Sequence, residues 1–267
     1  MSKSNRSRPA NPWWQRWLRR WRTWRGAGLA KTHQVDLIEI DGQRLKRVIF
    51  DSAETALAVS KALRQTADTG LFPALVFHHE FEVRVEFIPG PLARPGRDEL
   101  RLAAFFIELY RLPNNTVSLA DSGLMPRLES DLDFLLEHSL VEQDLSRRLL
   151  EMAGRLAPPS ILLGHDYIDP VAKNFVIVDG RAIAIDIEAL LADQPLGTGV
   201  AKARLRWPGL DIDQMMSRPG SAGGPDLIGQ YAFIELCFLA SYFRQKIIQR
   251  KPRHLQPEAL RAWLRQA

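Results

Sequence analysis

Short runs that alternate between apolar and polar residues dominate positions 34–88 and predict a small β-rich unit. Asp41-Gly42 joins the first two runs, and this dipeptide is a strong signal for a two-residue hairpin turn. Ser52 can cap the helix that follows, because its hydroxyl can accept a hydrogen bond from the first helical turn. Pro89-Gly90 ends the last run. The predicted elements are strands at 35–40, 44–50, 74–77 and 81–88 and a helix at 52–66.

Apolar residues recur at helical spacing through most of the chain from residue 97 onwards. The exception is a β-rich stretch at residues 161–187, which follows the helix-breaking pair Pro158-Pro159. A loop is expected at residues 208–226, which are rich in Gly and Pro. The predicted helices span 98–110, 130–138, 141–156, 226–249 and 256–266.

This order of elements predicts an α+β protein of two lobes, a small β-rich N-lobe and a mainly helical C-lobe. The expected divisions are a basic N-terminal segment at residues 1–30, the N-lobe at 31–90 and the C-lobe at 91–267. A cleft between two such lobes is a natural place for a nucleotide.

Residues 12–25 hold five of the seven tryptophans of the chain, interleaved with arginines. Wound as a helix, this segment places the tryptophans on one face and most of the arginines outside it. Indole rings at headgroup level and guanidinium groups on lipid phosphates suit an anionic membrane surface. Docking on the protein's own body and binding of nucleic acid stay open as alternatives, and nucleic acid is the least favoured partner.

Net charge and cysteine content place only weak limits on the partners and the cellular location of the protein. The 267 residues carry a net charge of +5 with a pI of about 9.5, which favours anionic partners without choosing among them. The single cysteine, Cys237, can form neither an internal disulfide nor a cysteine-rich metal site. No apolar run of about 18 residues predicts a membrane span. We expect a cytoplasmic protein, peripheral on the inner face of the membrane if residues 12–25 bind lipid.

The strongest chemical signal lies in residues 167–188. Asp169 is followed by Asn174, a short apolar strand, an Asp-Gly turn, a second strand and Asp186. A hairpin would carry Asn174 and Asp186 to the same end of its ladder, where their oxygens could hold Mg²⁺, a cation that prefers oxygen ligands. An acid five residues before the asparagine can then face an incoming hydroxyl.

This segment resembles the aminoglycoside phosphotransferase and choline kinase branch of the protein-kinase-like superfamily, including lipopolysaccharide-core kinases. That branch shows His-Gly-Asp-Leu-His-Pro-x-Asn, a hairpin, and then Ile-Asp-hydrophobic-Glu. The resemblance implies that Asp169 is the catalytic acid that orients or deprotonates the acceptor. It also implies that Asn174 and Asp186 are the metal ligands.

The resemblance extends upstream into the predicted N-lobe. Leu45-Lys46 is similar to the strand lysine that contacts the α- and β-phosphates of ATP. Residues 85–90 are similar to the hinge strand whose backbone meets adenine, which implies nucleotide contacts at Glu86 and Ile88. ATP and Mg²⁺ are the cofactors that the resemblance implies.

Several positions depart from the family pattern. Tyr167 stands where histidine is usual, and Pro170 stands where leucine is usual. Residues 26–28, Gly-Ala-Gly, form only a reduced version of a phosphate-covering loop. No glutamate in the predicted helix is well placed to pair with Lys46, and a one-residue shift in strand register would put Arg47 in its place.

Other charged positions carry weaker signals. Lys202, Arg204 and Arg206 alternate as a strand would present them, and could hold an anionic acceptor or form a solvated basic face. His165, just before the catalytic segment, is interpreted as a structural histidine rather than an acid–base group. Residues 78–82 hold two histidines and two glutamates, and we expect a turn there rather than a metal site.

The leading hypothesis is an ATP- and Mg²⁺-dependent phosphotransferase that acts on a hydroxyl of a small molecule or saccharide. If residues 12–25 bind a membrane, the acceptor could be lipid-linked, such as a lipopolysaccharide core sugar. The alternative is a catalytically weak pseudokinase that acts as a membrane-bound interaction or regulatory module.

Overall fold

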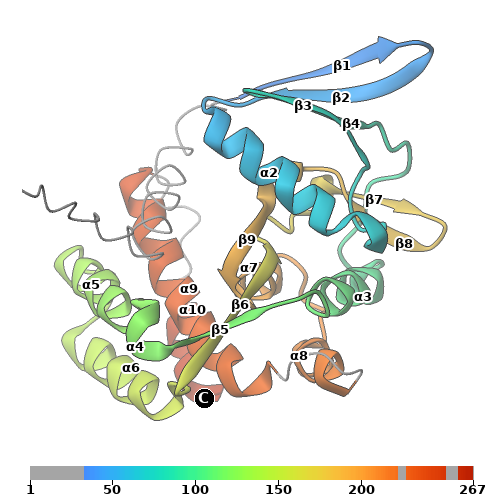
Figure 1. Cartoon of the computed structure of the whole chain (residues 1–267). Coiled ribbons are helices and arrows are strands. Elements are labelled where there is room, and N and C mark those ends of the chain that lie inside the picture. Colours follow the sequence, from blue (N-terminus) through green and yellow to red (C-terminus); the bar gives the residue numbers. More distant parts are fainter. Residues whose placement is uncertain (1–32, 222–226, 251–257, 267) are drawn as a thin grey trace, which may run out of the picture.

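The described part of the chain starts with a four-stranded antiparallel sheet that carries one long helix on one side (Figure 1). The computed structural model describes residues 33–221, 227–250 and 258–266. The predicted membrane-contacting helix at residues 12–25 and the Gly-Ala-Gly loop at 26–28 lie outside the described residues. The strands run in the spatial order β1-β2-β4-β3. The elements of this small lobe are β1 (Gln34–Ile40), β2 (Gln43–Ile49), α2 (Ala53–Gln65), the 3₁₀ turn η1 (Ala67–Thr69), β3 (Leu75–His79) and β4 (Glu82–Glu86).

Local sequence explains the turn and the cap that open this lobe. Asp41 and Gly42 have φ angles of 51° and 77°, the left-handed conformations that a two-residue hairpin turn requires. The hydroxyl of Ser52 accepts a hydrogen bond from the backbone N–H of Thr55 at 3.1 Å and so caps α2. Both features were predicted from the sequence, and both are confirmed.

The two faces of this sheet differ in character. Val48 and Val83 lie opposite each other in the register and are completely buried, on the side of the sheet that carries α2. On the other side, Arg47 pairs with Asp36 at 2.6 Å, and the Arg84 guanidinium lies 4.3 Å from the centre of the Phe77 ring. The alternation of residues along β2 and β4 therefore separates a core face from an exposed face.

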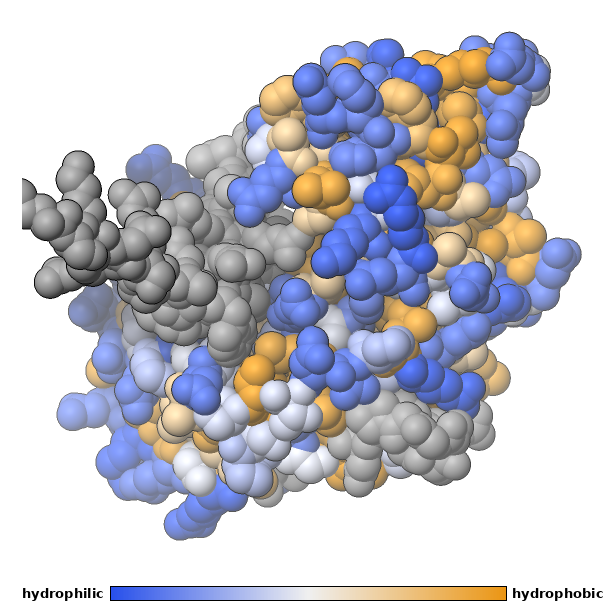
Figure 2. Space-filling model, in the orientation of Figure 1, coloured by the Kyte–Doolittle hydropathy of each residue, from blue (hydrophilic) through white to orange (hydrophobic). Residues whose placement is uncertain are grey.

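Hydrophobic surface is uneven on the face of the molecule seen in Figure 2. It is most continuous towards the upper right, over the small lobe, whereas the helical part below is mainly hydrophilic. Apolar side chains on the sheet contribute to the exposed surface; they include Val35 and Leu37 on β1 and Val76 and Phe77 on β3.

The rest of the chain forms the larger, mainly helical lobe (Figure 1). The long helix α9 is its centre, and α5, α6, α7, α8 and α10 all contact it. Among the described residues, no helix is long and apolar enough to span a membrane. The elements are α3 (Glu99–Leu109), β5 (Asn115–Ser118), α4 (Leu119–Ser122), α5 (Leu124–Glu137), α6 (Gln143–Leu156), β6 (Ser160–Tyr167), η2 (Ala172–Asn174), β7 (Phe175–Val178), β8 (Arg181–Ala184), η3 (Ile187–Ala189), β9 (Leu190–Pro195), α7 (Thr198–Arg204), α8 (Ile212–Ser221), α9 (Ile228–Ile248) and α10 (Glu258–Gln266).

Three expectations for this lobe are wrong or incomplete. Residues 202–206 were expected to alternate as in a strand, but α7 (Thr198–Arg204) occupies this region, and its helical turns direct the side chains differently. Helix α8 lies within residues 208–226, which were expected to form a loop. Helix α5 begins at Leu124 rather than at Ser130, because Pro126 in the first turn needs no backbone donor and starts a helix well.

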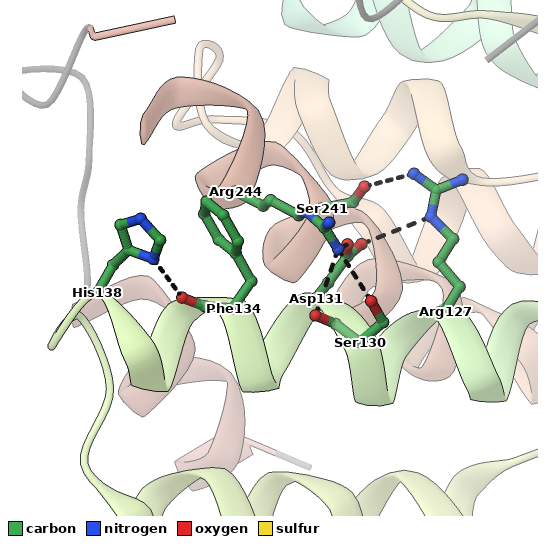
Figure 3. Close-up of polar contacts among 7 residues, drawn as sticks. All are labelled: Arg127, Ser130, Asp131, Phe134, His138, Ser241 and Arg244. Atoms are coloured by element: carbon green, nitrogen blue, oxygen red, sulfur yellow. Dashed lines mark hydrogen bonds and ion pairs between the residues drawn. The ribbon is translucent and has the colours of Figure 1, made fainter. Parts of the chain in front are cut away.

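A buried ion-pair network fastens α5 to α9 (Figure 3). Asp131 on α5 is 1% exposed, and Arg244 on α9 donates to it at 2.8 Å. Arg127 reaches the second oxygen of the same carboxylate at 3.5 Å and also donates to the Ser241 hydroxyl at 2.7 Å. The Arg244 guanidinium lies over the Phe134 ring. This buried carboxylate is thus held by two cations, as burial of a charge requires.

Replacement of Asp131 by alanine is expected to lower the free energy of unfolding by about 3 kcal/mol, because it leaves two partly buried guanidinium groups without their anion. Asp133→Ala on the same helix is the matched control: Asp133 is exposed, and the change should stay within about 0.5 kcal/mol. Urea unfolding of both variants measures the difference. Equal effects of the two substitutions would contradict a structural role for the network.

Candidate active site

The hairpin β7–β8 sets the geometry of the segment that the sequence singles out. Phe175 pairs with Ala184, and Asp179 and Gly180 make the turn with φ angles of 48° and 77°. At the open end, the backbone N–H of Ile185 donates to the carbonyl of Asn174 at 2.8 Å. Asn174 therefore lies opposite Ile185 at the open end of the hairpin, and Asp186 is the next residue along the chain.

Asn174 is bound directly to the predicted catalytic acid. Its buried side-chain amide donates to the Asp169 carboxylate at 3.1 Å and to the Asp169 carbonyl at 3.0 Å. Both hydrogen bonds use the amide nitrogen, so the amide oxygen remains the atom that can act as a metal ligand. Asp169 itself is about one-third exposed, as an acid that meets an incoming hydroxyl must be.

Lys46 reaches across from the small lobe to the same place. Its ammonium donates to the carbonyl of Ile185 at 2.9 Å and lies 3.9 Å from the Asp186 carboxylate. Arg47 points to the opposite face of the sheet, where it pairs with Asp36. The strand register therefore directs Lys46, and not Arg47, towards the predicted metal aspartate.

Two further groups, Glu188 and His33, belong to this cluster and were not among the predicted site residues. His33 lies 3.0 Å from the Glu188 carboxylate. Burial, together with the adjacent Glu188, raises the pKa of Asp186 to about 7. Glu188 holds its charge, because hydrogen bonds from His33 and Asp186 and the charge of Lys46 outweigh its burial and lower its pKa. The signal for Glu188 in the sequence is the Ile-Asp-hydrophobic-Glu pattern, in which it stands two residues after Asp186.

These donors fit Mg²⁺. Asn174 offers an amide oxygen and Asp186 a carboxylate, and both are oxygen donors of the kind that magnesium prefers. Burial, with Glu188 as a second cause, disfavours the charged form of Asp186, and a bound cation would favour that form. Among the described residues, no cluster of three or more His, Cys, Asp or Glu side chains could hold a metal, so this site depends on the asparagine.

Tyr167, which departs from the family pattern, is part of the core. Its ring is fully buried and packs edge-on against Phe105 and Phe175, with centroid distances of 5.7 and 5.2 Å. Burial raises the pKa of its hydroxyl, and the charges of Asp186 and Asp169 raise it further. The aromatic ring therefore packs in the core next to the site, near the carboxylates of Asp186 and Asp169.

A second buried carboxylate, Asp166, fixes the start of α7. It accepts hydrogen bonds from the Tyr110 hydroxyl at 3.0 Å, from the Tyr167 N–H at 2.8 Å and from the Gly199 N–H at 2.9 Å. Complete burial raises the pKa of Asp166 to about 6, and these donors oppose the rise. One carboxylate thus joins β6, α3 and α7 immediately before the catalytic loop.

Two more contacts tie the end of α7 to that loop. The Trp207 indole donates to the carbonyl of Pro170 at 2.6 Å, and the Lys202 ammonium donates to the Asp169 carboxylate at 2.6 Å. On the opposite side, Arg204 binds both oxygens of Glu235 on α9, at 2.8 and 3.0 Å. Lys202, Arg204 and Arg206 were expected either to hold an anionic acceptor or to form a solvated basic face, and Lys202 lies against the predicted catalytic acid, Asp169.

The connection between the lobes contains the predicted adenine contacts, Glu86 and Ile88. The N–H of Glu86, the last residue of β4, donates to the carbonyl of Ala74 at 2.9 Å. A cavity of about 590 Å³ is lined by both residues and by Arg64, His78 and Ile183. None of the catalytic-loop side chains lines it, so nucleotide contacts at Glu86 and Ile88 stay a prediction.

The histidines weighed in the sequence have structural surroundings. His165 lies on β6, and its ring nitrogen is 3.1 Å from the side-chain oxygen of Gln65 at the end of α2. His78 and His79 end β3, where Glu80 makes the turn with a φ of 46°. The expected turn at residues 78–82 is confirmed.

A lysine from the small lobe, an acid–asparagine pair and a hairpin-borne aspartate define the class of the chain: it has the bilobal protein-kinase-like fold predicted from its sequence. No protein-family model matches the chain, and no curated protein matches its sequence. Solved structures of small-molecule phosphotransferases share the fold.

Three of these structures illustrate the likeness. A choline kinase from Streptococcus pneumoniae is 12% identical, covers 94% of this chain and 99% of its own, and has a TM-score of 0.55. A putative fructosamine-3-kinase from Thermobifida fusca is 14% identical over 88% and 91%, with a TM-score of 0.60. An aminoglycoside phosphotransferase in complex with ADP and hygromycin B is 11% identical over 88% and 91%, with a TM-score of 0.58. At such identities the likeness establishes the fold alone.

Gly199→Ala is expected to lower the free energy of unfolding by about 3 kcal/mol, because a methyl group there would overlap the Tyr167 carbonyl and the Asp166 carboxylate. Gly154→Ala is the matched control on helix α6, where a methyl group meets nothing within 4 Å. That change should raise stability by about 0.5–1 kcal/mol through helix propensity. Thermal or urea unfolding compares the two, and a stabilising Gly199→Ala would refute the close contact.

Proposed function

We propose that this protein is an ATP- and Mg²⁺-dependent phosphotransferase that acts on a hydroxyl group of a small molecule or saccharide. The observation that carries the proposal is the convergence on one site of Lys46, Asp169, Asn174 and Asp186, which come from two lobes. Any one of these residues has an ordinary structural explanation. Their arrangement around the partly exposed Asp169 carboxylate supports phosphate chemistry.

Each residue has a distinct task in this proposal. Asp169 accepts the proton of the acceptor hydroxyl and orients its oxygen. Lys46 contacts the phosphates of ATP. The hydrogen bond from its ammonium to the Ile185 carbonyl directs the lysine towards the hairpin. Mg²⁺, held by Asn174 and Asp186, would neutralise charge on the phosphates. Glu188 keeps its charge beside Asp186 and raises the negative potential that a cation meets there.

The transfer itself balances without another reactant. The bond between the γ-phosphorus and the bridging oxygen breaks, and its electron pair stays on ADP. A bond forms between the same phosphorus and the acceptor oxygen, whose proton passes to Asp169. Catalysis of this kind rests on position and charge rather than on covalent chemistry by the protein.

The structural neighbours support a small-molecule acceptor but do not single out one compound. Their names identify choline, fructosamine and antibiotic kinases, and one of the structures contains ADP together with an antibiotic. All of these acceptors are small molecules rather than proteins. The suggestion of a lipid-linked sugar as acceptor rests on the sequence of residues 12–25.

Asp169→Asn and Asp186→Asn are each expected to lower ADP release from Mg·ATP by at least about 100-fold, because the first removes the proton acceptor and the second removes a metal ligand. Asp179→Asn is the matched control: it lies at the far turn of the same hairpin, where asparagine tolerates the positive φ. A coupled assay of ADP gives the rates.

The outcome separates the proposal from the pseudokinase alternative. Full activity in both Asp169→Asn and Asp186→Asn would refute the assignment of the site. A wild-type chain that shows no thermal shift with millimolar ATP and Mg²⁺ would instead favour the pseudokinase. Unchanged melting temperatures in the three variants make sure that lost activity does not reflect lost folding.

Contact with an anionic membrane through residues 12–25 is a separate proposal. The full chain should sediment with vesicles that contain about 30% anionic phospholipid and should not sediment with neutral vesicles. A chain that lacks residues 1–25 should lose this binding and keep its melting temperature. Equal sedimentation of both chains would refute the membrane role of this segment.

A further inference from the structure

Lys202 occupies a position that the sequence did not reveal. Its ammonium donates to one oxygen of the Asp169 carboxylate at 2.6 Å, and its side chain is only 14% exposed. It follows Asp169 by 33 residues, on a different element. The contact therefore exists only because α7 packs against the catalytic loop.

Helix α7 holds this ammonium in place from several directions. Gly199 packs against Asp166, and Lys202 follows Gly199 by three residues, so both lie on the face that meets the loop. The opposite side of the helix is fixed to α9 by Arg204 and Glu235. Just past the helix, Trp207 binds the Pro170 carbonyl. A flexible lysine stem thus starts from a rigid base.

Orientation of Asp169 does not by itself explain the lysine. Asn174 already binds the second oxygen and the carbonyl of Asp169, so the carboxylate is restrained from the other side. Partly exposed ion pairs of this kind contribute little to stability, typically about 0–1 kcal/mol. The property that Lys202 adds at this point is a positive charge next to the partly exposed carboxylate of Asp169.

The position of that charge suits the reaction. A hydroxyl bound to the same carboxylate oxygen would lie about 2.7 Å from it, which places the acceptor oxygen within roughly 5 Å of the ammonium. During transfer, negative charge spreads over the three equatorial oxygens of the phosphoryl group. Lys46 approaches the hairpin from the small lobe, and Lys202 approaches from the large lobe on the acceptor side.

We propose that Lys202 is a catalytic cation of this site, and that its ammonium contacts the phosphoryl group as it passes to the acceptor oxygen held at Asp169. The inference rests on the proposed phosphotransferase function. It assigns to α7 the positive charge on the acceptor side of the phosphoryl group, which neither residues 167–174 nor the hairpin β7–β8 is proposed to supply. In the resting site, the same ammonium neutralises Asp169.

Three substitutions separate charge from position. Lys202→Met removes both the charge and the hydrogen bond to Asp169. Lys202→Gln removes the charge but keeps an N–H donor, and Lys202→Arg keeps both. Arg206→Met is the matched control, because Arg206 lies four residues further on and its guanidinium contacts the Tyr242 hydroxyl instead. Melting temperatures are measured for all four variants.

The assay is steady-state ADP release from Mg·ATP, with water as the phosphoryl acceptor. Lys202→Met and Lys202→Gln are expected to lower kcat about 100- to 1,000-fold, with the KM for ATP within about threefold of wild type. Lys202→Arg should stay within about tenfold of wild type, and Arg206→Met within about twofold. If Lys202→Met does not fold, the difference in kcat between Lys202→Gln and Lys202→Arg still shows whether the charge is required.

Two results would overturn the inference while leaving the proposed function intact. Near wild-type kcat in Lys202→Gln would mean that a hydrogen bond to Asp169 suffices, and near wild-type kcat in Lys202→Met would mean that the lysine has no role. A wild-type chain that releases no ADP and also shows no thermal shift with millimolar ATP and Mg²⁺ would overturn the proposed function and this inference together. Loss of activity with a large rise in KM for ATP would place Lys202 in nucleotide binding instead.

Discussion

The buried carboxylate of Asp166 is the constraint on which the site depends. A charge with no exposure must be satisfied completely, and Asp166 takes its hydrogen bonds from three different elements. Those bonds fix α7 and α3 against β6 just before the catalytic loop. Because Gly199 has no side chain, the helix can approach closely enough for its N–H to reach the carboxylate. Because the buried carboxylate needs all of these hydrogen bonds, it also fixes the position of Lys202 relative to Asp169.

A second electrostatic link joins the two lobes. Lys46 and His33 come from the small lobe, and Asp186 and Glu188 come from the large lobe. Burial raises the pKa of Asp186 and the neighbouring Glu188 adds to the rise, whereas hydrogen bonds from His33 and Asp186 and the charge of Lys46 outweigh burial and lower the pKa of Glu188. A site that concentrates negative charge beside a lysine is prepared for a cation bound to phosphates. The same charges that would hold a nucleotide also hold the lobes together.

Much of the fold followed from local patterns. The two Asp-Gly turns, the Ser52 cap and the hairpin that presents Asn174 and Asp186 are properties of short segments, so the sequence was sufficient to predict them. The spacing of Asp169, Asn174 and Asp186, together with a family resemblance, predicted the candidate catalytic loop. Helix α7 was missed because its seven residues carry little periodic signal, and basic residues two apart fit a strand equally well.

The sequence by itself determined the order of the elements, the turns and the acid–asparagine–aspartate spacing, because these depend on neighbours along the chain. Only the tertiary structure decided which charged groups meet. Lys46 rather than Arg47 faces Asp186 because strand register sets the side-chain direction. Lys202 meets Asp169 across 33 residues because a buried carboxylate and a glycine bring α7 against the loop. Such contacts arise from packing between distant segments, which no local pattern encodes.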